Sequence, residues 1–165
     1  MQHKSYKIFT ITILTILTLF CLTGCSSNPK NFTVNDITIT LTSDFEKGKL
    51  EEFDVYITSD DVSFTANEES EEQLQYAGYE IANLKDYSSE IAILNGASPS
   101  SLTQRDDYYY FSSTKTISGA KYTYVHCLFE GNNSYWMCEF ACKTKDYDHY
   151  KDDIFEWADS ITIKK

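Results

Sequence analysis

YTYVHCLFEGNNSYWMCEFACK, residues 122–143, contains the two strongest strand patterns of the chain. Aromatic and β-branched residues dominate both halves, and the turn residues Gly131–Ser134 (GNNS) separate them. With Asn132 and Asn133 in the turn, we expect an antiparallel hairpin with an apolar face made of the pairs Thr123–Cys142, Val125–Phe140, Cys127–Cys138 and Phe129–Trp136. The opposite face then consists of the pairs Tyr122–Lys143, Tyr124–Ala141, His126–Glu139 and Leu128–Met137.

Alternating apolar residues predict further strands on either side of this hairpin. Upstream, the pattern occurs at 37–42, 53–57 and 62–66, and a turn at Ser59-Asp60 places Ile57 opposite Val62 and Val55 opposite Phe64. A tyrosine-rich strand region at 107–118 precedes a turn at Gly119.

Helical patterns lie between and after these strands. Ser70 and Gln73 form a capping box before a helix that Gly78 interrupts, and Asn83 caps a second helix that ends at Asn95-Gly96. The apolar stripe of the second helix is Leu84, Tyr87, Ile91 and Leu94, and that of a C-terminal helix is Tyr147, Tyr150, Ile154, Trp157 and Ile161. The order of elements predicts an α+β fold, with an antiparallel sheet flanked by helices.

Several segments of this pattern resemble the PsbP-like (Mog/PsbP) family, a fold also found in small bacterial lipoproteins. The segments are ITITLTSDF (37–45), FTANEE (64–69), LKDY (84–87), TISGAKYTY (116–124), SYWMCEF (134–140) and YKDDIFEWADSITI (150–163). The resemblance spans about residues 34–163 and implies an αβα sandwich. It also implies a non-catalytic binding or assembly module.

The N-terminal sequence has a pattern typical of a lipoprotein signal. Lys4 and Lys7 precede an apolar stretch that is shorter than the roughly 20 residues a spanning helix needs. The ending Leu22-Thr23-Gly24-Cys25 resembles a lipobox, which implies cleavage between Gly24 and Cys25 and a lipid on the Cys25 thiol. We therefore expect a signal peptide at 1–24, a lipidated Cys and tether at 25–33, and one PsbP-like domain at 34–165. The lipid would hold that domain on the extracytoplasmic face of the cell membrane.

The remaining chain is strongly acidic. Twelve basic residues face all 25 acidic ones after Cys25, a net charge of −13. Phosphate backbones and anionic lipids repel such a body, so nucleic acid is excluded as a partner and membrane contact is left to the lipid. Cations, basic peptides or basic protein faces are the expected partners, although acidic runs are also ordinary solvated surface.

Three cysteines remain beyond Cys25, and their pattern leaves alternatives open. Cys127 and Cys138 face each other across the predicted hairpin, so they form either a disulfide or a pair of buried thiols. With Cys142 and the distant His149 they lack the ligand spacing of a metal site. Asp146, Asp148, Asp152 and Asp153 invite a calcium interpretation, but they lack the glycine and terminal glutamate of an EF-hand loop.

Two surface constellations are candidate binding or catalytic groups. His126 opposite Glu139 suits acid–base chemistry, or a simple cross-strand ion pair. Tyr108 and Tyr110 share one strand face and offer either a stacking surface or core packing. No Gly-x-Ser-x-Gly, His-Glu-x-x-His or phosphate-loop motif occurs, so no catalytic residue, metal or cofactor is assigned.

These observations leave three functional hypotheses. The first is a membrane-anchored, non-catalytic module that binds a partner protein through its sheet edge, loops or tyrosine-rich surface. The second is an extracytoplasmic hydrolase that uses His126 and Glu139. The third is a receptor for a small ligand or cation.

Overall fold

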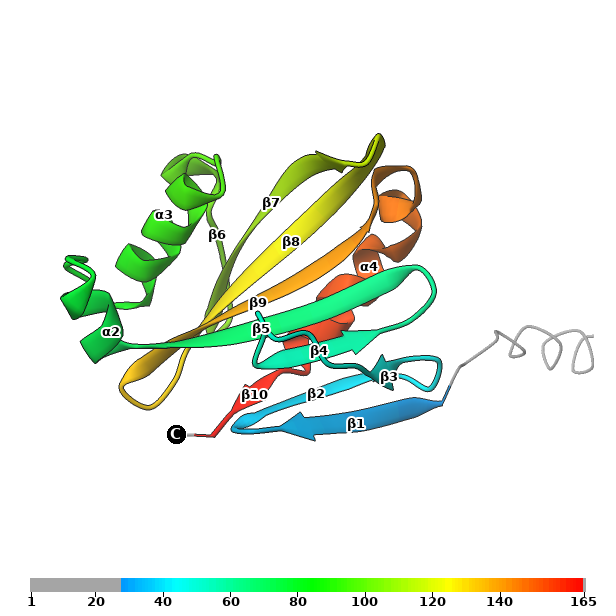
Figure 1. Cartoon of the computed structure of the whole chain (residues 1–165), viewed down its shortest axis with the longest axis horizontal. Helices are drawn as coiled ribbons and strands as arrows, with labels where there is room; N and C mark the ends of the chain where they lie inside the picture. The colour runs from blue at the N-terminus through cyan, green and yellow to red at the C-terminus, as the bar shows by residue number, and fades with distance from the viewer. Residues whose placement is uncertain (1–27, 165) are drawn as a thin grey trace, which may run out of the picture.

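The computed structural model describes residues 28–164, which form ten strands, three α-helices and two short 3-10 turns (Figure 1). The expected signal peptide and lipidation site, with Gly24 and Cys25, lie outside these described residues. In chain order the elements are β1 (Pro29–Val34), β2 (Ile37–Thr42), β3 (Glu46–Lys47), β4 (Val55–Thr58), β5 (Val62–Ser70), α2 (Glu71–Tyr76), α3 (Leu84–Leu94), η2 (Pro99–Ser101), β6 (Thr103–Arg105), β7 (Tyr108–Ile117), β8 (Ala120–Glu130), β9 (Ser134–Lys143), η3 (Thr144–Asp146), α4 (Tyr147–Asp159) and β10 (Thr162–Ile163).

The strands form two antiparallel sheets. The larger has seven strands in the order β3-β4-β5-β9-β8-β7-β6, and the smaller has the order β1-β2-β10. The β8–β9 hairpin has the predicted register in every pair, because Gly131 N–H donates to the Ser134 carbonyl oxygen at 2.8 Å and closes a two-residue turn. The predicted α+β class with an antiparallel sheet is confirmed.

The β4–β5 hairpin corrects one predicted register. Ile57 pairs with Phe64 and Val55 with Ala66, a shift of two residues from the expected partners. The turn lies one residue later than expected, at Asp60-Asp61, because Ser59 N–H donates to the Val62 carbonyl and Ser59 Oγ accepts from Val62 N–H, at 2.9 and 3.1 Å. A shift of two keeps every side chain on its predicted face, since side chains alternate with a period of two.

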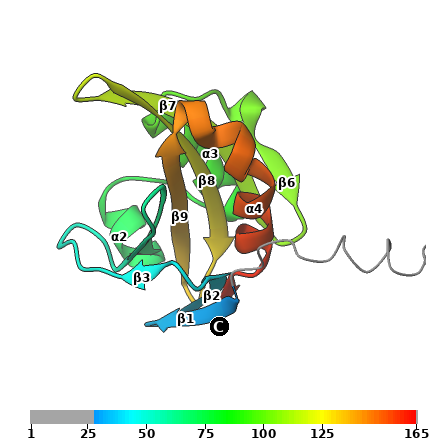
Figure 2. The ribbon, with the colours of Figure 1, turned by 90° about the vertical axis from the view of Figure 1, so that its right-hand side faces the viewer.

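The main core lies between one face of the large sheet and a cover made of the small sheet and α4 (Figures 1 and 2). Ile37, Ile39 and Leu41 from β2 face this core, as do Ile154 and Trp157 from α4. The predicted C-terminal helix is therefore confirmed, and its amphipathic stripe closes one side of the sandwich.

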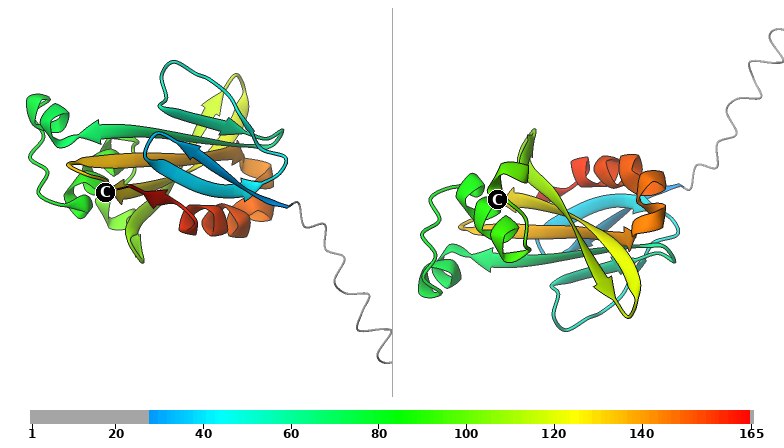
Figure 3. Two further views of the ribbon diagram at one scale, coloured as in Figure 1. Left: turned by 90° about the horizontal axis from the view of Figure 1, so that it is seen from below. Right: turned by 90° about the horizontal axis from the view of Figure 1, so that it is seen from above.

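The other face of the large sheet is covered by α2 and α3, which lie at the end of the sheet away from α4 (Figure 3). The predicted capping box is present, with Gln73 N–H donating to Ser70 Oγ at 3.1 Å, and Asn83 caps α3. Tyr87 and Ile91 are buried, whereas Leu94, which the predicted stripe included, is exposed. Leu94 is exposed because the last turn of α3 lies at the edge of the sheet area that this helix covers.

Four short strands, β1, β3, β6 and β10, are absent from the predicted order. Among them β1 begins at Pro29, so residues 29–33 of the expected tether pair with β2 in the folded domain. The region 107–118 is one continuous strand, β7, with a residue before it left in the turn. Within residues 28–164, no helix is both long and apolar enough to cross a membrane.

Candidate functional site

Part of the outer face of the large sheet has no helix over it. α2 and α3 cover Phe111, Leu128 and Tyr135, but leave the strands nearer the β4–β5 turn open (Figure 1). We call this area the open face. Its side chains are Tyr56 and Thr58 on β4, Ser63 and Thr65 on β5, Glu139, Ala141 and Lys143 on β9, and Tyr122 and Tyr124 on β8.

A groove of about 360 Å³ runs over the open face. Its floor consists of small side chains on the two central strands, where Ser63 pairs with Ala141 and Thr65 with Glu139. Larger tyrosines stand on the flanking strands, so a hollow lies between Tyr56 on one side and Tyr124 on the other. We call this hollow the tyrosine groove. Ligand sites commonly combine aromatic walls with a small number of polar groups that fix the orientation of the ligand.

The loop between β3 and β4 completes one wall. Gly48 N–H donates to the Tyr56 carbonyl at 3.0 Å, and a Cβ on Gly48 would lie 2.5 Å from Tyr56 Cδ1. Glycine is therefore required for the loop to close against the Tyr56 ring. The same loop contributes Leu50 and Phe53 to the groove lining.

Charge in the tyrosine groove is mainly negative. Glu139 lies in the floor with its side chain 18% exposed, Asp60 and Asp61 lie at the rim, and Lys143 is the one cation among the lining residues. Burial, and next the nearby Glu139 carboxylate, raise the pKa of Tyr124 above its usual value, so its phenol stays neutral at neutral pH. The groove thus combines neutral aromatic walls with carboxylates.

His126 lies at the edge of this groove and is fully buried. Its Nδ1 is 3.0 Å from Glu139 Oε2, as the predicted pairing implies, and its Nε2 is 2.9 Å from Ser113 Oγ. The imidazole is stacked on Phe111 with ring centroids 4.3 Å apart, and Tyr124 lies on its other side at 6.3 Å. Three neighbouring strands, β7, β8 and β9, therefore contribute a line of three polar side chains.

Ser113 was not singled out from the sequence. Its position follows from the β7–β8 register, in which Phe111 faces His126 and Ser113 faces Tyr124. The turn at Gly119, where φ is +83°, sets that register. The sequence could have predicted this position, because extending the strand pairing from the Gly119 turn brings Ser113 diagonally next to His126.

Tyr108 and Tyr110 share a strand face as predicted, but that face is covered. Tyr108 is 1% exposed, stacks on Phe129 at 4.8 Å and donates from its hydroxyl to Asp159 Oδ1 at 2.8 Å. Tyr110 packs edge-on against Phe155 of α4 at 4.8 Å. Of the two alternatives left open for these tyrosines, the structure therefore shows core packing, and the alternative of an exposed stacking surface is wrong. The tyrosines of the open face come from β4 and β8 instead.

Cys127, Cys138 and Cys142 are free, buried thiols. Cys127 and Cys138 are directly opposed, two steps of two residues from the hydrogen-bonded pair Gly131–Ser134, which makes them a hydrogen-bonded pair of the ladder. Cβ atoms in such pairs are too far apart for a relaxed disulfide. Burial raises the pKa of the Cys142 thiol to about 11, so it stays protonated and unreactive at neutral pH.

Acidic side chains also gather near the β4–β5 turn. Asp44, Glu46, Asp60 and Asp61 line a hollow of about 390 Å³ with Tyr150, whose hydroxyl donates to Asp61 at 3.0 Å. Among the described residues, no three His, Cys, Asp or Glu side chains converge as metal ligands would. Asp148, Asp152 and Asp153, from the calcium interpretation, lie on α4 and are exposed.

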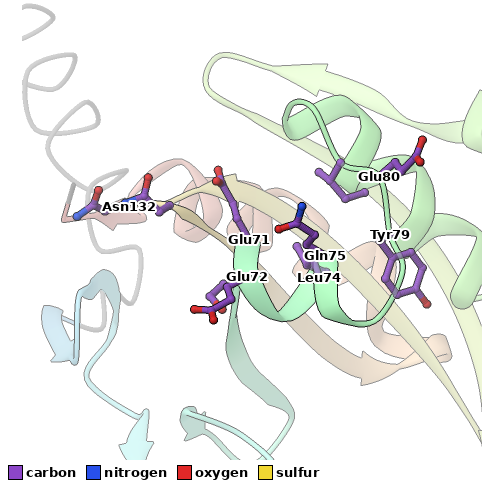
Figure 4. Close-up of a pocket in the computed structure, with 10 residues that line it drawn as sticks. Glu71, Glu72, Leu74, Gln75, Tyr79, Glu80 and Asn132 are labelled. Carbon is purple, nitrogen blue, oxygen red and sulfur yellow. The ribbon is translucent and has the colours of Figure 1, made fainter.

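Another hollow, about 660 Å³, lies at α2 rather than over the open face (Figure 4). Glu71 and Glu72 come from α2, Tyr79 and Glu80 from the segment after it, and Asn132 from the β8–β9 turn. These glutamates are exposed and their side chains do not converge on one point in Figure 4. We therefore place the candidate site at the tyrosine groove, where charged and aromatic groups are held by the sheet.

No protein-family model and no curated protein matches the chain. A crystal structure of a protein from Bacteroides thetaiotaomicron VPI-5482 aligns at TM-score 0.55 and 11% identity, over 85% of this chain and 49% of that chain. The chain thus spans about half the length of that protein. The solution structure of cyanobacterial PsbP (CyanoP) from Synechocystis sp. PCC 6803 aligns at TM-score 0.49 and 10% identity, over 87% of this chain and 96% of that chain.

The first of these similarities shows a common fold and nothing about activity, and the second is too low to carry an argument. The PsbP-like family therefore remains a resemblance. The class that fold and site define is an α+β domain with one covered and one partly open sheet face.

Proposed function

We propose that the protein is a lipid-anchored, extracytoplasmic binding module that holds a basic segment of a partner protein in the tyrosine groove. The observation that carries this proposal is the groove itself. Tyr56, Tyr122 and Tyr124 stand on an otherwise small-residue floor, with Glu139 between them. Elsewhere on the same sheet face a tyrosine that serves packing is buried under a helix, since Tyr135 of β9 is 3% exposed and stacks on Tyr87 of α3.

Charge supports a basic occupant. The lining has three carboxylates, Asp60, Asp61 and Glu139, against the single ammonium of Lys143. The full chain has a formal net charge of −11, so a basic partner is also attracted over longer distances. Tyrosine faces add cation–π attraction of about 0.5–1 kcal/mol each to Lys or Arg side chains at exposed sites.

A peptide titration followed by NMR tests the groove. Tri-lysine should shift the resonances of Tyr56, Thr65 and Glu139, and the shifts should weaken as salt screens the carboxylates. Tri-glutamate is the matched ligand control. Glu139→Gln should weaken binding at least severalfold, whereas Tyr109→Ala, near the far edge of the sheet, should leave it unchanged. Shifts produced equally by tri-glutamate, or confined to the α2 hollow, would contradict a basic occupant of this groove.

The anchor is proposed from the sequence pattern at Cys25. Four residue steps separate Cys25 from Pro29, the first residue of β1, so an extended chain spans at most about 14 Å between them. The domain would therefore lie close to the membrane, with α2 and α3 at the opposite end of the molecule from the start of β1 (Figure 1).

Fractionation of the producing cell tests this anchor. The wild-type protein should sediment with membranes and carry a mass increase from acyl chains on Cys25. Cys25→Ala should be found away from the membrane fraction without that mass. Membrane association that persists unchanged in Cys25→Ala would rule out a lipid anchor at this residue.

A further inference from the structure

Ser113, His126 and Glu139 form a line of hydrogen-bonding distances across three strands. Ser113 Oγ is 2.9 Å from His126 Nε2, and His126 Nδ1 is 3.0 Å from Glu139 Oε2. A hydroxyl, an imidazole and a carboxylate in that order are the parts of an activated serine nucleophile. Such a line needs no sequence motif, because the sheet rather than a loop brings the residues together.

The carboxylate determines which imidazole nitrogen can act as a base. Glu139 is an acceptor, so the proton of a neutral His126 belongs on Nδ1, which leaves the Nε2 lone pair for the Ser113 hydroxyl. Nδ1 lies 3.0 Å from Oε2 but lacks the alignment of a hydrogen bond, and catalytic hydrogen bonds commonly tighten only in the complex with substrate. The hydroxyl proton of Ser113 then has an acceptor at 2.9 Å.

Packing holds the imidazole in this orientation. His126 is fully buried between the ring of Phe111, which lies nearly parallel at 13°, and that of Tyr124. Ser113 is only partly buried, on the solvent side of the imidazole. A nucleophile requires a base held rigidly away from water, here His126, beside a hydroxyl that a substrate can reach, here Ser113.

A cation lies on the same strand face. Lys115 is two residues from Ser113 on β7, so both side chains stand on the outer face of the sheet. Its Nζ is 3.2 Å from Asn95 Oδ1 at the end of α3 and 5.3 Å from the centre of the Tyr124 ring. This ammonium would favour a negative oxygen that develops beside Ser113 on the same strand face.

We propose that Ser113 is a nucleophile that accepts acyl groups from carboxylic esters, with His126 as its base and Glu139 as the positioning residue. The Ser113 Oγ–acyl carbon bond forms while the Oγ proton moves to His126 Nε2. The alcohol then departs with that proton as the ester C–O bond breaks. Water next gives a proton to Nε2 and its oxygen to the acyl carbon. The Oγ–acyl carbon bond then breaks, Oγ takes the proton back from Nε2, and the acid is released with Ser113 and His126 restored. This activity goes beyond ligand binding.

A small fluorophosphonate tests the nucleophile on the full chain. Attack by Ser113 forms an O–P bond and releases fluoride, and the adduct adds a defined mass that peptide mapping locates. Folded wild-type protein should be labelled at Ser113, and Ser113→Ala should not be labelled. Ser112→Ala is the matched control, because Ser112 is the adjacent exposed serine on the opposite strand face and its loss should leave labelling intact.

Glu139→Gln tests the relay rather than the serine alone. Its side chain is partly exposed, so the variant should fold, which its melting temperature confirms. Labelling of Ser113 should slow on the order of 100-fold or more, since the amide no longer holds the productive tautomer. Absence of label on wild-type Ser113, or labelling that Glu139→Gln leaves unchanged, would overturn the proposal. Neither result would affect tri-lysine binding by the wild-type protein, so the two proposals fail separately.

Discussion

The two faces of the large sheet are made by the same strands and differ in what covers them. Along β9, Trp136, Cys138 and Phe140 point into the main core and are fully buried. Glu139 and Ala141, on either side of Phe140, point to the open face and stay partly accessible. Neighbouring residues of one strand therefore belong to a dry interior and to a wet groove.

This difference separates stability from binding. Apolar burial supplies most of the stabilising free energy, and here it is concentrated on the covered face. Substitutions on the open face should change ligand or nucleophile chemistry while the fold survives. Four predictions test that separation, beginning with the largest effect.

The covered face should be highly sensitive to truncation. Phe140→Ala removes a fully buried ring that contacts Phe64 at 4.9 Å between centroids, so unfolding free energy should fall by about 3–5 kcal/mol. Tyr124→Ala, on the open face of the paired strand, should cost only about 1 kcal/mol. Urea unfolding at pH 7 measures both, and equal losses would break the comparison between the faces.

The part of the outer face under α3 should behave as core. Tyr87 is fully buried, stacks on Tyr135 at 4.7 Å and donates to Glu69 Oε2 at 2.5 Å. Tyr87→Phe keeps the ring but removes this bond to a charged group, so about 1.5–3 kcal/mol should be lost in the same unfolding assay.

The pH dependence of stability sharpens this prediction. Burial, and next Glu69, raise the pKa of Tyr87 above its unfolded value of about 10. Its contribution is therefore complete below pH 10 and lost as the pH rises further, because the unfolded chain then releases the proton more readily. Wild-type protein should lose stability between about pH 9 and 11 more steeply than Tyr87→Phe. Parallel slopes would show that folding does not raise the pKa of Tyr87.

The cap of α2 should contribute a smaller amount. Ser70→Ala removes the acceptor for Gln73 N–H and should cost about 1 kcal/mol, with local loss of amide protection in α2. Glu72→Ala on the same helix is the control, since it leaves the cap intact. Loss of protection across the whole sheet, rather than in α2, would show that α2 is not a separate cover.

The smallest effect concerns the ion pair at the edge of the covered face. Arg105 donates to Asp159 through Nε at 2.8 Å, but both side chains are more than a third exposed. Asp159→Asn should therefore cost no more than about 1 kcal/mol at pH 7. The Arg105 hydrogen bond lowers the pKa of Asp159, so what the pair contributes is present above about pH 4 and lost as the pH falls. When the free energy of unfolding is measured as the pH falls, Asp159→Asn should therefore lose less stability than the wild-type protein, by the contribution of this pair.

Local signals predicted much of this fold correctly. The GNNS turn, the Ser70 capping box and the Asn83 cap each depend on residues within a few positions of one another. Such contacts depend only on residues that are neighbours along the chain, so they can be predicted from the sequence. The long hairpin then follows, because its register is set by its own turn.

Features that depend on distant contacts were missed or misplaced. β10 has two residues and is a strand only because it pairs with β2, more than 100 residues away. Tyr108 and Tyr110 have the alternation of a surface strand, and their burial depends on where α4 packs. For the candidate site, the sequence indicated His126 and Glu139, and the pairing at the Gly119 turn could have added Ser113. The groove between Tyr56 and Tyr124, in contrast, required the position of β4 in the sheet.

By itself the sequence determined the class of the fold, the pairing of its central hairpin, the helix caps and the acidic charge, because each follows from composition or from neighbours along the chain. Only the tertiary structure decided which sheet face is covered and which tyrosines are accessible. Those outcomes depend on packing between segments far apart in the chain. Alternation along a strand distinguishes its two faces, but only the elements that pack on them determine which one meets water.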